Sequence, residues 1–329
     1  MRTEARFPDV GVGAGHYESF YIKATRPGGG QGLWIRHTVH KRPGEQPSAS
    51  IWLTLFDADS AGPRATKLTV PAAQVSAPAG AYIEIDGARL GPERADGQIT
   101  GDDGLSVSWD LELASDAEAF HHLPYSFLYR GPLPKTKLLS PHPSGRWSGT
   151  VVVDGRETEI DAWPGMVGHN WGSEHAERWS WIQANEFRET DGYFDAALGR
   201  IKLGPLTTPW IGNGVLAVDG ELHRLGGLGR IRSTRVDDEP TECEFELAGA
   251  EVRVRGRVSS EPRNFVGWVY AVPEGPEHNT LNCSISDMEL TVERKGREPQ
   301  RLECIGAAAY EIGMRETDHG IELQPFGDG

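Results

Sequence analysis

The feature that most constrains this chain is the dipeptide Asp-Gly, repeated between segments in which polar and apolar residues alternate. It occurs at 86–87, 96–97, 103–104, 154–155, 191–192 and 219–220. Asp and Gly tolerate the positive φ angles of tight hairpin turns. Such a pair between alternating segments therefore predicts two antiparallel strands joined by a short turn.

The flanking segments alternate as half-buried strands do. Residues 105–113 place Leu, Val, Trp, Leu and Leu on one side and Ser, Ser, Asp and Glu on the other. Residues 251–258 alternate as cleanly, and 82–85, 151–153 and 158–160 are rich in β-branched, aromatic or alternating residues. Because strand side chains point alternately to opposite faces, this period of two predicts an all-β chain of antiparallel sheets, as in sandwiches and barrels.

Three stretches interrupt this pattern. Residues 115–122 are the best helix candidate, short and ending before Pro124, with His121 and His122 expected in a surface loop. Residues 131–145 contain four prolines, which argue against regular structure and predict an extended or polyproline segment, either a linker or a strap that ends one barrel. The sequence Trp163-Pro164-Gly165 marks the expected seam between two β domains, residues 1–167 and 168–329.

Charge and composition exclude several classes of partner. With 33 basic and 48 acidic residues the formal net charge is −15, and no dense basic run provides the footprint that nucleic acid requires. The same acidity argues against an anionic membrane surface as partner. The N-terminus lacks the apolar core of a signal peptide, and no apolar run is long enough to span a bilayer. Cys243, Cys283 and Cys304 have no metal-like spacing and are expected as reduced, buried thiols of a cytoplasmic protein.

A stretch near the midpoint has the composition of a site rather than of a scaffold. Imidazole titrates near neutral pH, and a buried indole N–H needs a hydrogen-bond partner. Residues 168–183 combine two histidines and three tryptophans, namely His169, His175, Trp171, Trp179 and Trp181. The nearby sequence Tyr193-Phe194-Asp195 is interpreted as the second half of the same site.

Two pairs of side chains there are candidates for acid catalysis. Residues two apart in a strand point the same way, so His169 shares a face with Trp171, and Tyr193 with Asp195. If both pairs meet at one cavity, a neutral Asp195 can protonate an alkene while the two aromatic rings stabilise the cation. His169 would then orient the acid or accept a proton from the water molecule. Core aromatics beside an aspartate in a capped turn explain the same spacing without any chemistry.

A metal site is the weaker interpretation of the histidines. His169, His175 and the neighbouring glutamates offer zinc ligands, and so do His37 and His40. The chain contains neither a His-Glu-x-x-His motif nor a pair of cysteines, and His37 and His40 would face opposite sides of a strand. The sequence therefore predicts no metal and no cofactor.

These residues resemble the hallmark of a known family. Residues 168–172, Gly-His-Asn-Trp-Gly, followed by Glu174-His175 and Trp179-x-Trp181, are similar to the midpoint motif of the carotenoid hydratase (hydroxyneurosporene synthase) superfamily. That group is also described as AttH-like or tandem lipocalin-like, and it includes tocopherol-cyclase-like proteins and fungal Diels–Alderases. Further segments resemble the family's opening hairpin, the strap before its midpoint and a recurrent late strand, namely 17–21 with 33–37, 135–143 and 282–284.

The resemblance implies two packed, lipocalin-like antiparallel β-barrel domains, with an apolar ligand in a barrel pocket or between the domains. It also implies which residues act. Those that match the family's residues for acid-catalysed addition of water to an isoprenoid double bond are His169, Trp171, Tyr193 and Asp195. Those expected to contact the substrate are Trp34, His37, Trp179 and Trp181.

The expected function is that of a cofactor-independent enzyme acting on a C=C bond of an apolar isoprenoid or polyene. Acid catalysis would lead to hydration, cyclisation or isomerisation. Two alternatives stay open at this point. One is a pericyclase of the Diels–Alderase type, and the other is a lipocalin-like protein that binds a hydrophobic ligand without chemistry.

Overall fold

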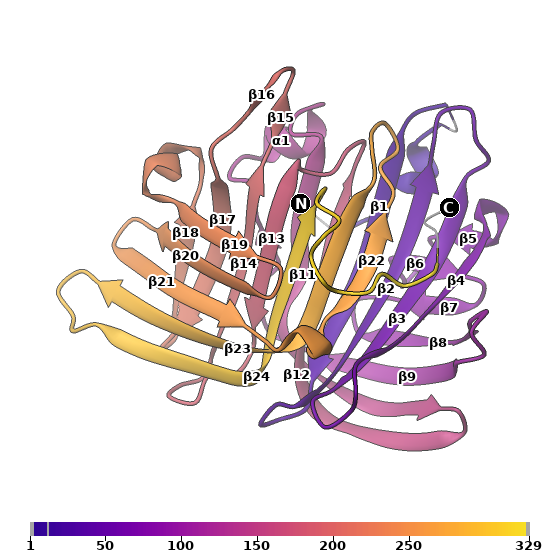
Figure 1. The fold of residues 1–329 in the computed structure, drawn as a ribbon, viewed down its shortest axis with the longest axis horizontal. Helices are drawn as coiled ribbons and strands as arrows, with labels where there is room; N and C mark the ends of the chain where they lie inside the picture. Colours follow the sequence, from indigo (N-terminus) through magenta and orange to yellow (C-terminus); the bar gives the residue numbers. More distant parts are fainter. Residues whose placement is uncertain (1–2, 12, 327–329) are drawn as a thin grey trace.

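The computed structural model describes residues 3–11 and 13–326. Nearly all of its regular structure is β-strand, arranged in two large antiparallel sheets that pack against each other (Figure 1). The first sheet is a nearly closed barrel and the second a half-barrel, so the prediction of two packed lipocalin-like β units is confirmed. The only α-helix in the described ranges is α1 (Ser126–Arg130), so no described helix is long enough to cross a bilayer.

The first sheet contains strands β1 to β12, which pair in the order β4-β3-β2-β1-β12-β11-β9-β8-β7-β6-β5, with β10 beside β11. The strands are β1 (His16–Thr25), β2 (Gln31–Lys41), β3 (Ser48–Asp57), β4 (Arg64–Pro71), β5 (Val75–Ser76), β6 (Ile83–Ile85), β7 (Ala88–Leu90), β8 (Arg94–Thr100), β9 (Ser106–Ala114), β10 (Phe120–His121), β11 (Thr136–Val153) and β12 (Arg156–Gly172). Two 3-10 helices accompany them, η1 (Phe7–Asp9) and η2 (Ala72–Gln74).

The second sheet pairs in the order β18-β17-β14-β13-β24-β23-β21-β20-β19, with β22 beside β23 and a separate hairpin β15–β16. The strands are β13 (Arg178–Ala184), β14 (Gly192–Arg200), β15 (Lys202–Leu203), β16 (Leu206–Thr207), β17 (Ile211–Val218), β18 (Glu221–Gly226), β19 (Arg235–Glu239), β20 (Glu242–Ala248), β21 (Val252–Ser259), β22 (Val266–Tyr270), β23 (His278–Arg294) and β24 (Gln300–Met314). Its 3-10 helices are η3 (Leu228–Ser233) and η4 (Pro262–Asn264).

The Asp-Gly dipeptides act mostly as predicted. Both residues of 86–87, 154–155 and 219–220 have positive φ, and these pairs close the hairpins β6–β7, β11–β12 and β17–β18. The prediction of a turn at 96–97 is wrong, because these residues lie inside β8. Gly97 is needed there for space, since a Cβ atom would lie 2.8 Å from the Trp109 ring.

Strand β11 runs through the proline-rich segment that the sequence predicts to be irregular. Its pairing with β12 shifts register between Leu139 and His142, and again between His142 and Gly145. Pro141 and Pro143 lie at these shifts, where a residue without an N–H group does not interrupt the hydrogen-bond ladder. The prediction of no regular structure is therefore wrong for residues 136–145.

Residues 115–122 are not helical, which corrects a second expectation. Their end forms β10, which pairs with β11, and the short helix α1 begins only at Ser126. The expected surface loop is wrong for His122, whose side chain is 2% exposed. Its Nδ1 atom lies 3.3 Å from the backbone oxygen of Asn213, so the segment after β10 reaches the second sheet.

Alternation along β1 and β2 divides their side chains between the two cores. Phe20 and Ile35 point into the first barrel, whereas Tyr21 and Trp34 join the core that the second sheet builds. The first sheet continues to Gly172, beyond the expected boundary at 167, and residues 163–165 lie within β12. The midpoint stretch is therefore shared between the two sheets, and the outer face of β1, β2 and β12 meets the second sheet.

Candidate functional site

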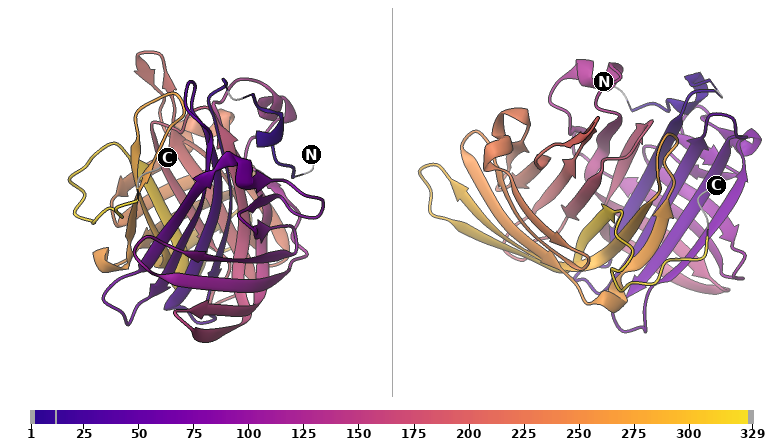
Figure 2. Two further views of the ribbon diagram at one scale, coloured as in Figure 1. Left: turned by 90° about the vertical axis from the view of Figure 1, so that its right-hand side faces the viewer. Right: turned by 45° about the horizontal axis from the view of Figure 1, so that its top comes forward.

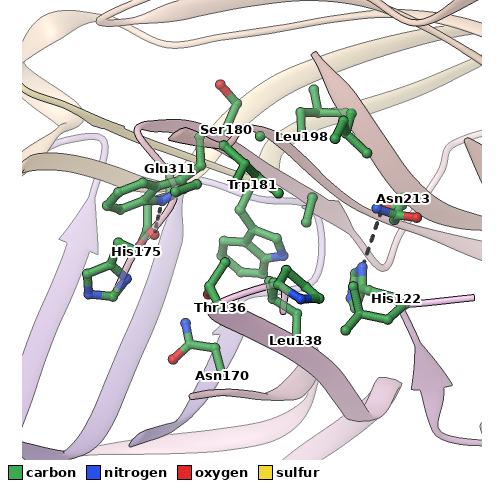
Figure 3. Close-up of a pocket in the computed structure, with 18 of the residues that line it drawn as sticks. His122, Thr136, Leu138, Asn170, His175, Ser180, Trp181, Leu198, Asn213 and Glu311 are labelled. Carbon is green, nitrogen blue, oxygen red and sulfur yellow. Dashed lines mark hydrogen bonds between the residues drawn. The ribbon is translucent and has the colours of Figure 1, made fainter. Parts of the chain in front are cut away.

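A pocket of about 110 Å³ lies between the two sheets (Figure 3). The first sheet and the segment around α1 provide Tyr21, Trp34, Arg36, His122, Leu123, Pro134, Thr136, Leu138 and Asn170. The second sheet and its approach provide His175, Ala176, Trp179, Ser180, Trp181, Ala197, Leu198, Gly199, Ile201, Ile211, Asn213, Tyr270 and Glu311. The wall is therefore aromatic and apolar, with a few polar groups at separate points.

Two indole rings from β13 form the centre of this wall. Trp179 and Trp181 are two residues apart, so they share a strand face. Trp179 donates its indole N–H to Glu311 Oε1 at 3.1 Å, and Trp181 donates to Asp195 Oδ1 at 3.1 Å. Each ring is thereby fixed beside a carboxyl group. An aromatic face attracts a cation, and nearby negative charge adds to that attraction.

Asp195 lies fully buried behind Trp181. Its Oδ2 atom accepts a hydrogen bond from Ser140 Oγ at 2.5 Å and lies 3.4 Å from His122 Nε2. Burial alone raises the pKa of this carboxyl, but the His122 ring and the hydrogen bonds from Ser140 and Trp181 outweigh it and hold the pKa below its usual value. Its surroundings therefore favour an ionised Asp195, in contrast to the neutral acid that the sequence analysis expects.

His122 lines the pocket and has acceptors at both ring nitrogens. Nδ1 faces the backbone oxygen of Asn213, which only accepts, so Nδ1 carries a hydrogen. Nε2 lies 3.2 Å from Ser140 Oγ and 3.4 Å from Asp195 Oδ2. Because the Ser140 hydroxyl donates its single hydrogen to Asp195, both neighbours of Nε2 act as acceptors. Both ring nitrogens therefore face acceptors, and this set of partners suits an imidazolium beside the Asp195 carboxylate at the cavity wall.

Glu311 provides a second carboxyl group, on the other side of Trp181 from His122 (Figure 3). It accepts hydrogen bonds from Trp179 at 3.1 Å, from the Tyr270 hydroxyl at 3.2 Å and from Asn282 Nδ2 at 3.2 Å. The Arg36 guanidinium lies over the Tyr270 ring, 4.0 Å from its centroid. The pocket thus has an acid on one side and a hydrogen-bonded carboxyl on the other.

Tyr193 and Asp195 share one face of β14, as expected. Tyr193 packs against Phe120, and the Phe120 ring meets the His122 ring with centroids 4.8 Å apart. Phe194, between them, points away and stacks on Phe245. Tyr193 therefore supports the buried acid from behind and is not among the residues that line the pocket.

His169 and Trp171 share a face of β12, but that face points away from the pocket. Asn170, between them, lines the pocket, so alternation turns the two rings into the first barrel. There they stack with centroids 4.4 Å apart, and His169 also stacks on Phe20 at 3.9 Å. The structure therefore does not bring this pair and the Tyr193–Asp195 pair to one cavity.

Three of the four expected substrate contacts line the pocket, namely Trp34, Trp179 and Trp181. His37 does not line it and is fully buried in the first sheet. Burial lowers the pKa of His37 to about 3, so its ring is neutral. His175 does line the pocket, and its ring lies 4.0 Å from that of Tyr17. Within residues 3–11 and 13–326, no three His, Cys, Asp or Glu side chains gather as a metal site would require.

A separate polar cluster surrounds Glu18 inside the first barrel. The carboxyl accepts hydrogen bonds from the backbone N–H groups of Arg6 and Phe7, and it lies 2.7 Å from His169 Nε2 and 3.4 Å from His16 Nε2. Burial raises the pKa of Glu18, but the two histidines and the backbone donor outweigh it and lower the pKa to about 2. The cluster ties the N-terminal segment and η1 to β1 and β12.

We expect the free energy of unfolding to fall as the pH is lowered from 6.5. Between that pH and about 3, an unfolded chain binds a proton at His37 that the folded chain does not. The stabilisation from Glu18 is complete above its ordinary value of 4.5 and is lost as the pH falls toward 2. Urea unfolding at pH 7, 5 and 4 measures the decline. A His37→Gln variant should show a shallower decline, and equal slopes would contradict this origin.

Comparison with known proteins identifies several with a similar sequence or a similar fold. No family model matches the chain. The uncharacterized protein Rv0493c of Mycobacterium tuberculosis is 26% identical over 310 residues, which cover 92% of this chain and 88% of that protein. Among solved structures, CghA has a TM-score of 0.55 at 12% identity, covering 92% of this chain and 89% of that one. Kievitone hydratase from Nectria haematococca has a TM-score of 0.50 at 9% identity, covering 92% and 90%. These likenesses show that the chain shares its fold with CghA and with kievitone hydratase.

Proposed function

We propose that this protein, whose fold is shared with CghA and with kievitone hydratase, is an enzyme that acts by acid catalysis on a C=C bond of an apolar small molecule. The observation that carries the proposal is the His122–Asp195 pair at the wall of an aromatic pocket. A buried imidazolium is a proton donor with little access to bulk water. The aromatic and apolar lining fits an isoprenoid or polyene segment.

The first step transfers a ring proton of His122 to one carbon of the C=C bond. The π electrons form the new C–H bond, and the other carbon becomes a cation. The faces of Trp179 and Trp181 stabilise that cation, and the carboxyl groups bonded to their indole N–H groups add negative charge nearby. His122 is left neutral beside an ionised Asp195.

Three outcomes follow from the same cation. Water adds and then loses a proton, which is hydration. An internal hydroxyl or second double bond adds, which is cyclisation. A neighbouring C–H bond loses its proton, which is isomerisation. In each case one proton leaves the substrate and returns to the neutral His122, directly or by way of Glu311, which restores the acid.

The residues named by the sequence divide into roles on this scheme. Asp195 holds the proton on His122, and Tyr193 supports that pair through Phe120. His169 and Trp171 are positioning residues, because their stacked rings fix the strand segment that presents Asn170 to the pocket. No cofactor has a part in the proposed steps.

A pericyclase is the second candidate. The observation that favours it is the His122 ring, a hydrogen-bond donor at the pocket wall. The His122 ring can hydrogen-bond to a carbonyl group of a folded polyene and polarise it without giving up the proton. In that case the aromatic wall selects the substrate's folded shape, and no cation forms.

Incubation with apolar candidates tests whether the protein is an enzyme or a carrier. Isoprenoid phenols and conjugated polyenes are incubated with the purified protein, extracted, and analysed by mass spectrometry with chromatography. We expect a product whose mass or retention time differs from that of the added compound, and no such product from a Trp179→Ala/Trp181→Ala variant. A ligand that binds the wild type tightly and returns unmodified would identify a carrier and contradict the proposal.

A further inference from the structure

Exposed apolar side chains gather at one end of the molecule. In the described part of the chain eight large hydrophobic residues are exposed, and five of them belong to two segments, 123–137 and 200–211, which we call the rim. The five are Tyr125, Phe127, Leu133, Leu203 and Leu206, with exposed fractions of 53% to 72%. The first segment carries α1 and the second the hairpin β15–β16, and both project at the same end (Figures 1 and 2).

The rim borders the pocket. Leu123 and Pro134, on either side of α1, both line the cavity. Ile201 and Ile211, on either side of the β15–β16 hairpin, line it as well. Each segment thus leaves the pocket wall, exposes its apolar residues and returns to the wall. The exposed apolar surface is therefore continuous with the cavity lining.

The charge of the rim differs from that of the rest of the chain. In a protein of net charge −15, the two segments contain no Asp or Glu, and their five basic residues are Arg130, Lys135, Lys137, Arg200 and Lys202. Lys137 is buried, and Lys135 pairs with Glu174 outside the rim. Arg130 and Lys202 are exposed. The apolar residues are thus accompanied by positive charge.

An anionic bilayer surface has the matching chemistry. Apolar and aromatic side chains enter the boundary between headgroups and acyl chains, and neighbouring Lys and Arg bind the headgroup phosphates. Salt screens charges that lie more than about 8–10 Å from the surface. Acidic residues farther from the bilayer than this, which argue against a membrane partner when averaged over the chain, therefore have little influence at the rim.

We propose that the rim docks on an anionic lipid bilayer. Phe127 and Leu206, at 62% and 72% the most exposed of the five, enter the bilayer boundary, and Arg130 and Lys202 face the phosphates. Docking places the pocket against the bilayer, so an apolar molecule moves between lipid and pocket without crossing water. That last consequence rests on the proposed function, whereas the docking itself does not.

Flotation with lipid vesicles tests the docking. Vesicles of phosphatidylcholine alone are compared with vesicles of an equal mixture of phosphatidylcholine and phosphatidylglycerol. We expect the wild type to float with the mixed vesicles, less with the neutral ones, and less at high salt. A Phe127→Ser/Leu206→Ser variant should bind the mixed vesicles about tenfold more weakly or worse, since it removes two inserted side chains.

Matched controls use equally exposed residues outside the rim. Leu222 and Leu228 are 61% and 55% exposed, and a Leu222→Ser/Leu228→Ser variant should float like the wild type. Lys202→Glu should weaken binding to the mixed vesicles, whereas Lys295→Glu, at a side chain 81% exposed, should not.

Three results would overturn the docking proposal. They are a wild type that does not float, a control pair that loses as much binding as the rim pair, and a wild type that forms dimers through the rim without binding vesicles. Sedimentation velocity of the wild type and of the rim variant detects the third. Because flotation needs no turnover, failure of the docking and failure of the proposed chemistry are distinguishable.

Discussion

Replacing Asp195 by Asn should lower the turnover number by about 10²–10⁴-fold, the range that a positioned acid or base contributes in enzymes. The amide carries no negative charge, so the His122 ring loses the partner that keeps it protonated. Because the pocket lining itself is unchanged, the KM for an apolar substrate should change much less. Steady-state kinetics on the substrate found by incubation measures both constants, with circular dichroism to confirm the fold.

Three further variants make this prediction specific. His122→Gln should lower turnover as much as Asp195→Asn, and the double variant should be no worse than either single one, because the two residues act as one proton-holding unit. Asp191→Asn, an exposed acid shortly before the same strand, is the control and should leave turnover unchanged. Turnover retained in Asp195→Asn would contradict a role of Asp195 in catalysis. Additive losses in the double variant would show that His122 and Asp195 act independently.

Replacing Glu18 by Gln should lower the free energy of unfolding by about 1.5–3 kcal/mol, the contribution of hydrogen bonds to a charged group. The change leaves His169 and His16 without their carboxylate and weakens the acceptor for two backbone N–H groups. Urea unfolding at pH 7 measures the loss.

Glu45→Gln is the matched control, because its side chain is 57% exposed. It should change stability by no more than about 0.5 kcal/mol. If Glu18→Gln costs no more than this control, the cluster does not hold the N-terminal segment to the first barrel. A Glu18→Gln/His169→Gln variant should lose less than the sum of the single variants, since the two residues share one contact.

The strands were predictable because they depend on local patterns. Alternation over 105–113 and 251–258 corresponds to β9 and β21, and paired indoles at a spacing of two correspond to the shared face of Trp179 and Trp181 on β13. The predictions of strands and turns failed where contacts between residues distant in the sequence determine the local structure. Gly97 is demanded by the Trp109 ring rather than by a turn, and register shifts allow prolines within β11.

The acid pair was only half predictable. Asp195 belongs to the motif that the sequence resembles, but its partner His122 belongs to no motif. The two meet because β10 pairs with β11 and the following residue crosses to the second sheet, where Asn213 fixes its ring. Glu311 likewise reaches the pocket from a distant strand, β24. The spacing of residues along the chain does not predict contacts between such distant strands.

The positions of His169 and Trp171 depended on a single assignment. A domain boundary at 167 puts the midpoint motif at the start of the second β domain, where its aromatic face would meet Tyr193 and Asp195. In the structure residues 168–172 end β12 of the first sheet, so that face points into the first barrel. Period two identifies which residues share a face, but it does not say which sheet that face belongs to.

In the proposed reaction a proton from the pocket wall is transferred to a carbon of the substrate. The most direct measurement is turnover by the wild type in heavy water, with the product analysed by mass spectrometry and NMR after exchange back into light water. We expect one deuterium that stays bound to the protonated carbon, and loss of that product in Asp195→Asn. A product formed at full rate without carbon-bound deuterium would contradict acid catalysis and favour a pericyclic reaction.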